Sequence, residues 1–402
     1  MMDTIFALSS GRPPAGIGVI RISGPQAEAA LTHLTGRSIA PRRAYYSALC
    51  DSEGHILDQA LVLWLPGPAT VTGEDIAELH VHGGRAVIAA VEAELASIPG
   101  LRAAQAGEYT QRAFANGKID LAQAEGLAEL LSAETELQRR LAIEQAGGWL
   151  SRQIEGWRQT ILQLGALIEA ELDFSDEEDV PDDTMASFHH ALAELRTELA
   201  AWLSRPRMEK LGEGFRVVIA GPPNAGKSTL FNALAEKEAA ITSPMAGTTR
   251  DILERNIAIE GIPFSFVDTA GLRHQTDDSV EAIGIARAEA ELALADLVLW
   301  LGPEGEGPDN AWEIEARNDT PGAPDTHSKV EPRHSLSAVT GKGMVSFKAD
   351  LLSEARNRLP RPGEGALNAR QAGLILTAND ALERISPATD LLLIAENLRQ
   401  AR

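Results

Sequence analysis

The sequence predicts a multidomain protein that combines α/β domains with an all-α domain, and three stretches support this fold class. Residues 1 to about 118 alternate short apolar strands with helices. From Ile119 to Leu172, apolar residues recur at three- and four-residue spacing, which is typical of helices. Near Arg216, an apolar strand, a glycine-rich loop and a helix follow one another, which predicts a P-loop nucleotide domain.

Length and composition limit the classes of function that fit this chain. Its 402 residues are enough for two or three domains, and a hydrophobic content of 44% allows buried cores. A net charge of −22 argues against a broad nucleic-acid-binding face, though not against a local basic patch. Cys50 is the single cysteine, so no intramolecular disulfide forms. Without a signal peptide or an 18-residue apolar run, we expect a cytoplasmic protein that does not enter a membrane.

Local patterns predict the elements of the N-terminal domain. Gly18–Gly24 is a strand that ends in a glycine turn, and Leu61–Leu65 is a strand stopped by Pro66. Ile76–Val81 alternates apolar and polar residues, as a half-buried strand does, and a helix over Ala86–Leu95 follows.

His80 and His82 are expected on one face of the strand Ile76–Val81. Two imidazoles at this spacing fit a metal site, but the sequence nearby offers no third ligand. We therefore favour ordinary polar side chains on an exposed face over metal binding.

Helical periodicity continues after the stretch that ends at Leu172. Ser187–Leu203 is a predicted amphipathic helix, and the pattern returns much later at Ala369–Leu382 and Asp390–Leu398. The simplest topology inserts the nucleotide domain between two parts of one helical domain. A plain tandem order is the alternative.

The segment Gly221–Ser228 fits G-x-x-x-x-G-K-[ST], the phosphate-binding loop of nucleoside triphosphatases. Arg216–Ala220 before it is predicted as a buried parallel strand, and a helix over Ser228–Leu234 follows. Backbone N–H groups at the helix N-terminus bind phosphates. Lys227 is expected to reach the β- and γ-phosphates, while Ser228 binds Mg²⁺. The predicted nucleotide contacts here are Asn224, Ala225, Gly226, Lys227, Ser228 and Thr229.

Three later segments occur in the order that a GTPase needs. The loop Gly247–Asp251 supplies Thr248 and Thr249, and Thr249 is expected to bind Mg²⁺ as part of a first switch. The strand Phe264–Val267 leads to Asp268, which reaches the Mg²⁺ through its hydration shell. The last strand and its guanine-side loop are predicted at 335–338. The remaining predicted contacts in these segments are Gly247, Thr269, Ala270, Gly271, Ser337 and Ala338.

Longer motifs point to one family. They are Gly-Val-Ile-Arg-Ile-Ser-Gly at 18–24, Thr-Gly-Glu-Asp-Ile-Ala-Glu-Leu at 72–79, His-Gly-Gly at 82–84, Gly-Glu-Tyr-Thr-Gln-Arg-Ala-Phe-Ala-Asn-Gly-Lys-Ile-Asp-Leu-Ala-Gln-Ala-Glu at 107–125 and Asp-Phe-Ser-Asp-Glu-Glu at 173–178. With the GTPase segments, they make the sequence similar to the MnmE (TrmE) family of tRNA-modifying GTPases over nearly the whole chain.

The resemblance implies a domain order and partners. It implies an N-terminal folate-binding and dimerisation domain over 1–118, a helical domain split between 119–212 and 361–402, and an inserted Ras-like P-loop GTPase domain over 213–360. It also implies a homodimer and an FAD-dependent partner, MnmG, which forms a heterotetramer with it. Together the two proteins of the family add an aminomethyl or carboxymethylaminomethyl group to C5 of the wobble uridine in certain tRNAs.

The resemblance also implies roles for residues that match the family motifs. Arg21, Glu78 and Lys118 match positions that contact 5-formyltetrahydrofolate or a related tetrahydrofolate. This is chemically sensible, because a pterin edge pairs with a carboxylate and a glutamate tail with a cation. Glu281 matches the catalytic glutamate, and Leu272 occupies the position where Ras-type enzymes have a water-positioning glutamine.

In the family a K⁺ ion takes the electrostatic role of an arginine finger. Asn224 matches its side-chain ligand, and Ser243, Met245 and Thr248 match loop positions that help to hold it. Pro244 and Ala246 of the same loop are further predicted GTP contacts. The resemblance implies that the G domains of two protomers meet across their nucleotides.

The chain departs from the family pattern in two places. The base-reading motif Asn-Lys-x-Asp is replaced by Ala316-Arg317-Asn318-Asp319, which leaves only Asp319 to read guanine. The surrounding segment Gly302–Pro332 is short and rich in Pro and Gly, with little room for the usual helix and strand. The family also ends in Cys-x-Gly-Lys, whereas this sequence stops at Arg402, through truncation or through loss of part of the modifying site.

Two other functions remain alternatives. One is a GTP-regulated switch that binds RNA or ribosomes without modifying them. The other is a partly degenerate paralogue that binds nucleotide without modifying activity. The long N-terminal motifs argue against the RNA-binding switch. The altered base-reading motif is consistent with the degenerate paralogue.

Overall fold

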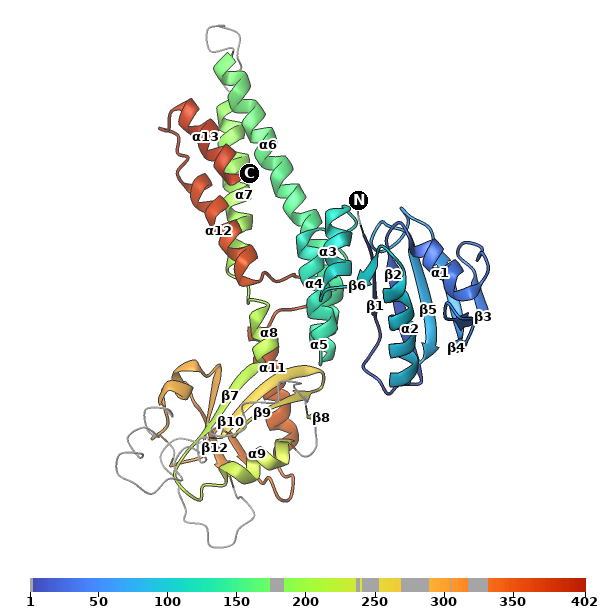
Figure 1. Ribbon diagram of the computed structural model, residues 1–402. Helices are drawn as coiled ribbons and strands as arrows, with labels where there is room; N and C mark the ends of the chain where they lie inside the picture. The colour runs from blue at the N-terminus through green and yellow to red at the C-terminus, as the bar shows by residue number, and fades with distance from the viewer. Residues whose placement is uncertain are drawn as a thin grey trace, which may run out of the picture. The chain divides into compact units, whose positions relative to one another are not determined.

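The computed structural model describes residues 3–173, 184–235, 239–240, 253–268, 289–303, 305–316 and 332–402. The chain divides into two compact units, Met1–Ala124 and Glu125–Arg402. In Figure 1 the first unit contains the blue sheet, and the second contains the long helices together with the nucleotide domain.

The first unit is built on a six-stranded sheet with the order β3-β4-β5-β2-β1-β6. All neighbours are antiparallel except β1 and β6. Apolar residues on alternate strand positions pack against two helices, α1 and α2. These packed side chains form the core of this unit. Its elements are β1 (Thr4–Leu8), β2 (Ile17–Ser23), α1 (Ala27–Thr35), β3 (Ala44–Cys50), β4 (Ile56–Leu65), β5 (Ile76–His82), α2 (Arg85–Ser97), β6 (Leu101–Ala103) and α3 (Glu108–Ala115).

The opposite face of this sheet carries polar and exposed apolar side chains. The strand register places Arg21 opposite Glu78, and His80 between Val19 and Leu61. Because side chains alternate along a strand, these residues share the face that points away from the α1–α2 core. Exposed Tyr46 lies opposite Leu61 on the same face. We call this surface the open sheet face.

The second unit contains a helical part whose segments lie far apart in the sequence. The helices α12 and α13 pack beside α6 and α7, as Figure 1 shows. Glu125 in α4 accepts hydrogen bonds from Arg370 Nε at 2.7 Å, Asn368 Nδ2 at 3.0 Å and Gln371 Nε2 at 2.7 Å. The helices are α4 (Leu121–Ser132), α5 (Glu136–Ala146), α6 (Trp149–Asp173), α7 (Thr184–Leu203), α8 (Glu209–Glu213), α12 (Ala369–Glu383) and α13 (Leu391–Ala401).

In the sequence, a nucleotide domain lies between these helical segments. It is built on a seven-stranded sheet with the order β13-β12-β11-β7-β10-β9-β8. The strands from β13 to β10 are parallel to their neighbours, and β9 and β8 are antiparallel. The predicted fold class, with a discontinuous helical domain and an inserted P-loop domain, is confirmed. The elements are β7 (Phe215–Ala220), α9 (Lys227–Ala235), β8 (Ala239–Ala240), β9 (Leu253–Ile259), β10 (Ile262–Asp268), β11 (Leu297–Trp300), β12 (Trp312–Ala316), β13 (His334–Leu336) and α11 (Met344–Arg358).

One expectation about this sheet was wrong. The segment Gly302–Pro332 seemed to leave little room for a strand, yet β12 lies within it and pairs with β11 and β13. Trp312 and Ile314 are buried in alternation with Glu313 and Glu315, which is the period of a half-buried strand. The Pro and Gly residues flank this short alternation rather than interrupt it.

Helix α5 is joined to the nucleotide domain at the turn between β9 and β10. The Leu137 N–H at the start of α5 donates to the Gly261 carbonyl at 3.0 Å. Gly261 has φ +78°, and a Cβ placed there would lie 2.9 Å from Glu136 Cβ. The turn therefore needs glycine both for its backbone and for its close approach to the helix. Leu141, one turn further along α5, is buried in the core of the nucleotide domain.

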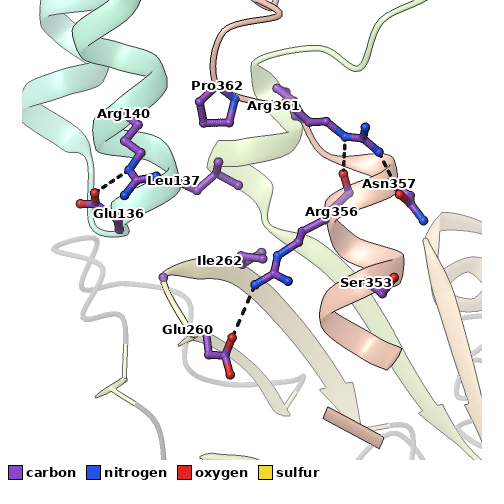
Figure 2. A pocket seen from close by; sticks show the side chains of 12 residues that line it. Glu136, Leu137, Arg140, Glu260, Ile262, Ser353, Arg356, Asn357, Arg361 and Pro362 are labelled. Carbon is purple, nitrogen blue, oxygen red and sulfur yellow. Dashed lines mark hydrogen bonds and ion pairs between the residues drawn. The ribbon is translucent and has the colours of Figure 1, made fainter. Parts of the chain in front are cut away.

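A cavity of about 580 Å³ lies beside this contact (Figure 2). Three arginines line it, and each has a partner. Arg140 Nε donates to Glu136 at 2.7 Å, Arg356 pairs with Glu260 at 3.5 Å, and Arg361 donates to Asn357 at 2.8 Å. Because each of these three guanidinium groups already has a polar partner, we assign no ligand to the cavity.

Candidate functional site

The predicted phosphate-binding loop connects β7 to α9 with a backbone that only some residues can adopt. Gly221 has φ +144°, and a Cβ there would lie 2.9 Å from the Leu301 backbone. Gly226 has φ +98°, and Asn224 has φ +62°. Asn tolerates left-handed backbone better than most residues, because its short polar side chain bonds locally. The loop thus keeps its shape without a bulky side chain near the expected phosphates.

Lys227, the first residue of α9, lies across this loop. Its side chain is buried, and Nζ donates to the Gly221 carbonyl at 2.8 Å and to the Pro222 carbonyl at 2.7 Å. The ammonium group is therefore held where the loop backbone and the N-terminus of α9 face the same space. Both features favour a bound anion.

Ser228 and Asp268 meet at the carboxyl ends of two neighbouring parallel strands. Asp268 ends β10 and pairs with Ile219 of β7, so it lies next to the loop that follows β7. The Ser228 hydroxyl donates to Asp268 Oδ2 at 2.8 Å. A hydroxyl and a carboxylate are hard oxygen ligands, so the pair fits Mg²⁺, one ligand binding directly and the other through water.

The loop after β13 lies on the side of the nucleotide site where the guanine base is expected. Ser337 is fully buried, and its Oγ accepts from the Thr340 N–H at 3.1 Å. The Ser337 N–H donates to the Lys342 carbonyl at 2.9 Å. Ala338 packs against the core of the nucleotide domain. The strand β12 ends at Ala316 and runs parallel to β13, so both strands deliver their loops to the same edge of the sheet.

Arg21 and Glu78, two of the predicted folate contacts, form an ion pair on the open sheet face. Arg21 donates from Nε at 2.9 Å and from Nη2 at 2.7 Å, and both bonds go to Glu78 Oε1. His80 Nε2 lies 3.6 Å from Glu78 Oε2, which is beyond hydrogen-bond distance. The Tyr109 hydroxyl of α3 donates to the Arg21 carbonyl at 2.5 Å and so fixes the strand beneath the pair.

Lys118, the third predicted folate contact, lies against the motif segment that leads into β5. A Cβ at Gly73 would lie 2.9 Å from Lys118 Cε, and Gly73 has φ +80°. Asn116 Nδ2 donates to the Thr72 carbonyl at 2.7 Å. The structure therefore brings Lys118 close to residues 72–74, but no contact of Lys118 with Arg21 or Glu78 is recorded among the described residues.

A partly buried ionic network supports this region and was not predicted from the sequence. Arg112 pairs with Glu74 at 3.1 Å and with Glu108 at 3.0 Å. Arg102 donates to Glu108 Oε2 at 2.8 Å, and hydrogen bonds from this guanidinium lower the pKa of Glu108 to about 2. Arg112 and Glu108 lie one turn apart in α3, whereas Glu74 comes from the motif at 72–79, so its pairing with Arg112 left no local signal.

Many predicted site residues lie outside the part of the chain that the structure describes. They are Ser243, Pro244, Met245, Ala246, Gly247, Thr248, Thr249, Thr269, Ala270, Gly271, Glu281 and Asp319. Within the described residues, no group of three or more His, Cys, Asp or Glu side chains is placed to hold a metal ion. None of the helices in that part is both long and apolar enough to cross a membrane.

Two sequence profiles match this chain and together account for almost all of it. The profile for the N-terminus of the GTP-binding protein TrmE matches residues 4–118, and the profile for the MnmE helical domain matches residues 121–402. The chain belongs to the MnmE family of tRNA modification GTPases. The resemblance and the enzyme class inferred from the sequence, a GTP hydrolase, are therefore confirmed.

Curated MnmE proteins are similar over the full chain. The tRNA modification GTPase MnmE of Novosphingobium aromaticivorans is 60% identical, covering 100% of this chain and 94% of the relative. That of Erythrobacter litoralis is 58% identical with the same coverage. Among solved structures, the G domain of the T. maritima FeoB iron transporter covers 35% of this chain and 98% of its own at 24% identity. Its TM-score of 0.23 is too low to support an inference.

Proposed function

We propose that this MnmE-family GTPase is activated by K⁺ and acts with the FAD-dependent protein MnmG on tRNA. The two proteins add an aminomethyl or carboxymethylaminomethyl group to C5 of the wobble uridine in certain tRNAs. The observation that carries the nucleotide part is the contact of Ser228 with Asp268 beside the buried Lys227. The N-terminal unit binds the folate and forms the homodimer. The protein acts in the cytoplasm.

In this proposal each nucleotide-site residue has one task. The loop N–H groups and Lys227 bind the phosphates, while Ser228 and Thr249 bind Mg²⁺. Glu281 orients the attacking water. Asn224, Ser243, Met245 and Thr248 hold the K⁺ ion, whose charge stabilises the transition state. The exposed Asn224 is the one member of that K⁺ set within the described residues, and its position in the phosphate loop is compatible with the role.

The folate and dimer proposals draw support from the open sheet face. Arg21 and Glu78 are each less than one-third exposed, and both hydrogen bonds from Arg21 go to Glu78 Oε1. Around them lie apolar side chains that a second subunit is expected to cover, because Ile17 is 62% exposed and Tyr46 is 70% exposed. In this proposal Lys118 binds the negatively charged tail of the folate.

Reconstitution of the whole reaction tests the proposed function. The purified chain is incubated with MnmG, GTP, 5-formyltetrahydrofolate, FAD, NADH as reductant, ammonium or glycine as the amine source and unmodified tRNA, and the nucleosides are identified by mass spectrometry. We expect a modified wobble uridine that requires every component. GTP hydrolysis without any modified uridine would favour the RNA-binding switch, and nucleotide binding without hydrolysis would favour the degenerate paralogue.

A further inference from the structure

The motif at 72–79 begins with a short segment, Thr72–Glu74, that is fixed from two sides. Thr72 is fully buried, and its hydroxyl lies 2.8 Å from the hydroxyl of Ser23, the last residue of β2. Glu74 accepts a hydrogen bond from Ser23 at 2.8 Å and forms an ion pair with Arg112 of α3 at 3.1 Å. The backbone of this segment therefore has little freedom to move.

The residues around Lys118 are fixed against the same segment. Asn116 Nδ2 donates to the Thr72 carbonyl at 2.7 Å. The Lys118 N–H donates to the Ala113 carbonyl at 2.8 Å, which holds Lys118 to the end of α3. Displacing either backbone from the other would break one of these hydrogen bonds.

Gly73 lies at the point where the two segments approach most closely. A Cβ at Gly73 would lie 2.9 Å from Lys118 Cε, 3.1 Å from Asn116 Cβ and 3.4 Å from Lys118 Cγ. The distance to Cε is well below the about 3.5–4.0 Å at which two carbon atoms pack. Because both backbones are fixed, the flexible Lys118 side chain is the group that a Cβ would displace.

We propose that Gly73 is a positioning residue of the folate site. Without a Cβ, it lets the Lys118 side chain lie against the motif backbone and so holds the ammonium group ready for the folate tail. This inference rests on the proposed folate function and adds a residue to it. A lysine side chain has many rotamers, so holding it in place before binding reduces the entropy that binding costs. The ammonium group then forms charge-assisted hydrogen bonds with the tail carboxylates.

The sharpest test compares two ligands that differ only in the charge of the tail. One is 5-formyltetrahydrofolate, and the other is its diamide, in which uncharged carboxamides replace both tail carboxylates. The pterin ring is the same in both ligands, so contacts to the ring cancel in the comparison. We expect the unaltered protein to bind the charged ligand about tenfold more tightly. Gly73→Ala should lose most of this preference and keep its Kd for the diamide.

Two further variants control for backbone strain and folding. Gly54→Ala is the matched control, because Gly54 has φ +87° in the same unit but open space around its Cβ position. It carries similar strain without displacing Lys118, so it should keep the preference. Gly73→Asn adds a Cβ at the same place with a residue that tolerates left-handed backbone. It should lose the preference as Gly73→Ala does, and it supplies the test if Gly73→Ala does not fold.

A double variant shows whether Gly73 acts through Lys118. Lys118→Met removes the ammonium group and should abolish the preference for the charged ligand by itself. Adding Gly73→Ala to Lys118→Met should then cause no further loss of preference, because both changes act on one group. Calorimetric titration gives the affinities, and thermal unfolding shows whether each variant is folded.

The outcomes distinguish this inference from the proposal on which it rests. If Gly73→Ala and Gly73→Asn keep the full preference, or weaken both ligands equally, the role of Gly73 is wrong. If the unaltered protein binds both ligands equally, Lys118 does not bind the tail and the inference fails, although the folate site remains. If the unaltered protein binds no 5-formyltetrahydrofolate, the folate site itself is wrong.

Discussion

The Ser228 hydroxyl donates a hydrogen bond to Asp268 Oδ2 at 2.8 Å and so links the phosphate loop to the end of β10. The other end of β10 is the Gly261 turn, whose carbonyl accepts from the first turn of α5. One seven-residue strand therefore runs from the expected Mg²⁺ ligands to the helical part of the same unit. Changes at either end test different parts of the account.

Removal of the Lys227 ammonium should abolish most of the GTPase activity. Lys227→Ala leaves the loop without the cation that lies across it, so we expect kcat/KM for GTP to fall by at least about 100-fold. A matched control is Lys348→Ala, which removes a lysine from α11, a helix that contributes none of the predicted GTP contacts. Steady-state phosphate release measures both, and a Lys227→Ala rate close to that of the control would contradict the site.

The contact between Gly261 and Glu136 should be sensitive to a single methyl group. Gly261→Ala forces a Cβ into the space occupied by Glu136 Cβ, in addition to straining a backbone of φ +78°. Gly305→Ala is the control, because Gly305 has the same φ but open space around its Cβ position. Both variants should lose about 1–2 kcal/mol of unfolding free energy because of backbone strain. Gly261→Ala should lose about 1–3 kcal/mol more, as measured by denaturant unfolding.

Glu125 should stabilise the packing of the helical segment before the nucleotide domain against the segment after it. Glu125→Ala leaves Arg370, Asn368 and Gln371 without their shared acceptor, and we expect a loss of about 2 kcal/mol in unfolding free energy. Glu396→Ala removes an exposed ion pair with Arg399 within α13 and should cost less than about 0.5 kcal/mol. Equal losses in the two variants would argue against a special role for Glu125.

The N-terminal unit should lose stability in acid through Glu108. The Arg102 guanidinium lowers the pKa of Glu108 from 4.5 to about 2 in the folded chain. A carboxylate with a depressed pKa stabilises the folded state above its unfolded value and loses that contribution as pH falls. Hydrogen-exchange protection in the first unit, corrected for the intrinsic exchange rate at each pH, should therefore decrease as pH falls from 4.5 to 2, and Glu108→Gln should flatten this dependence. An unchanged pH profile in Glu108→Gln would contradict this assignment.

Local patterns were enough to predict much of the fold. The phosphate loop, β10 and the helices α12 and α13 each have a strong periodic or motif signal, and all of them lie where the sequence indicated. The strand β12 was missed because five alternating residues are surrounded by Pro and Gly. The pairings of Glu125 with Arg370 and of Arg112 with Glu74 join residues far apart in the sequence, so they could not be predicted from any single stretch of it.

The candidate sites were predictable to different degrees. Lys227 and Ser228 follow from a motif whose chemistry is fixed by its spacing. Arg21, Glu78 and Lys118 stood out only through the family resemblance, since isolated charges on a strand are usually solvated. No sequence pattern singled out Gly73, because its closeness to Lys118 depends on how two separate segments pack.

The most direct test of the account is GTP hydrolysis by the purified protein in KCl and in NaCl at equal ionic strength. We predict much faster turnover in KCl, and loss of this difference in Asn224→Ala, because the proposed K⁺ ion replaces an arginine finger. Equal and negligible rates in both salts would contradict the claim that this chain is a K⁺-activated GTPase.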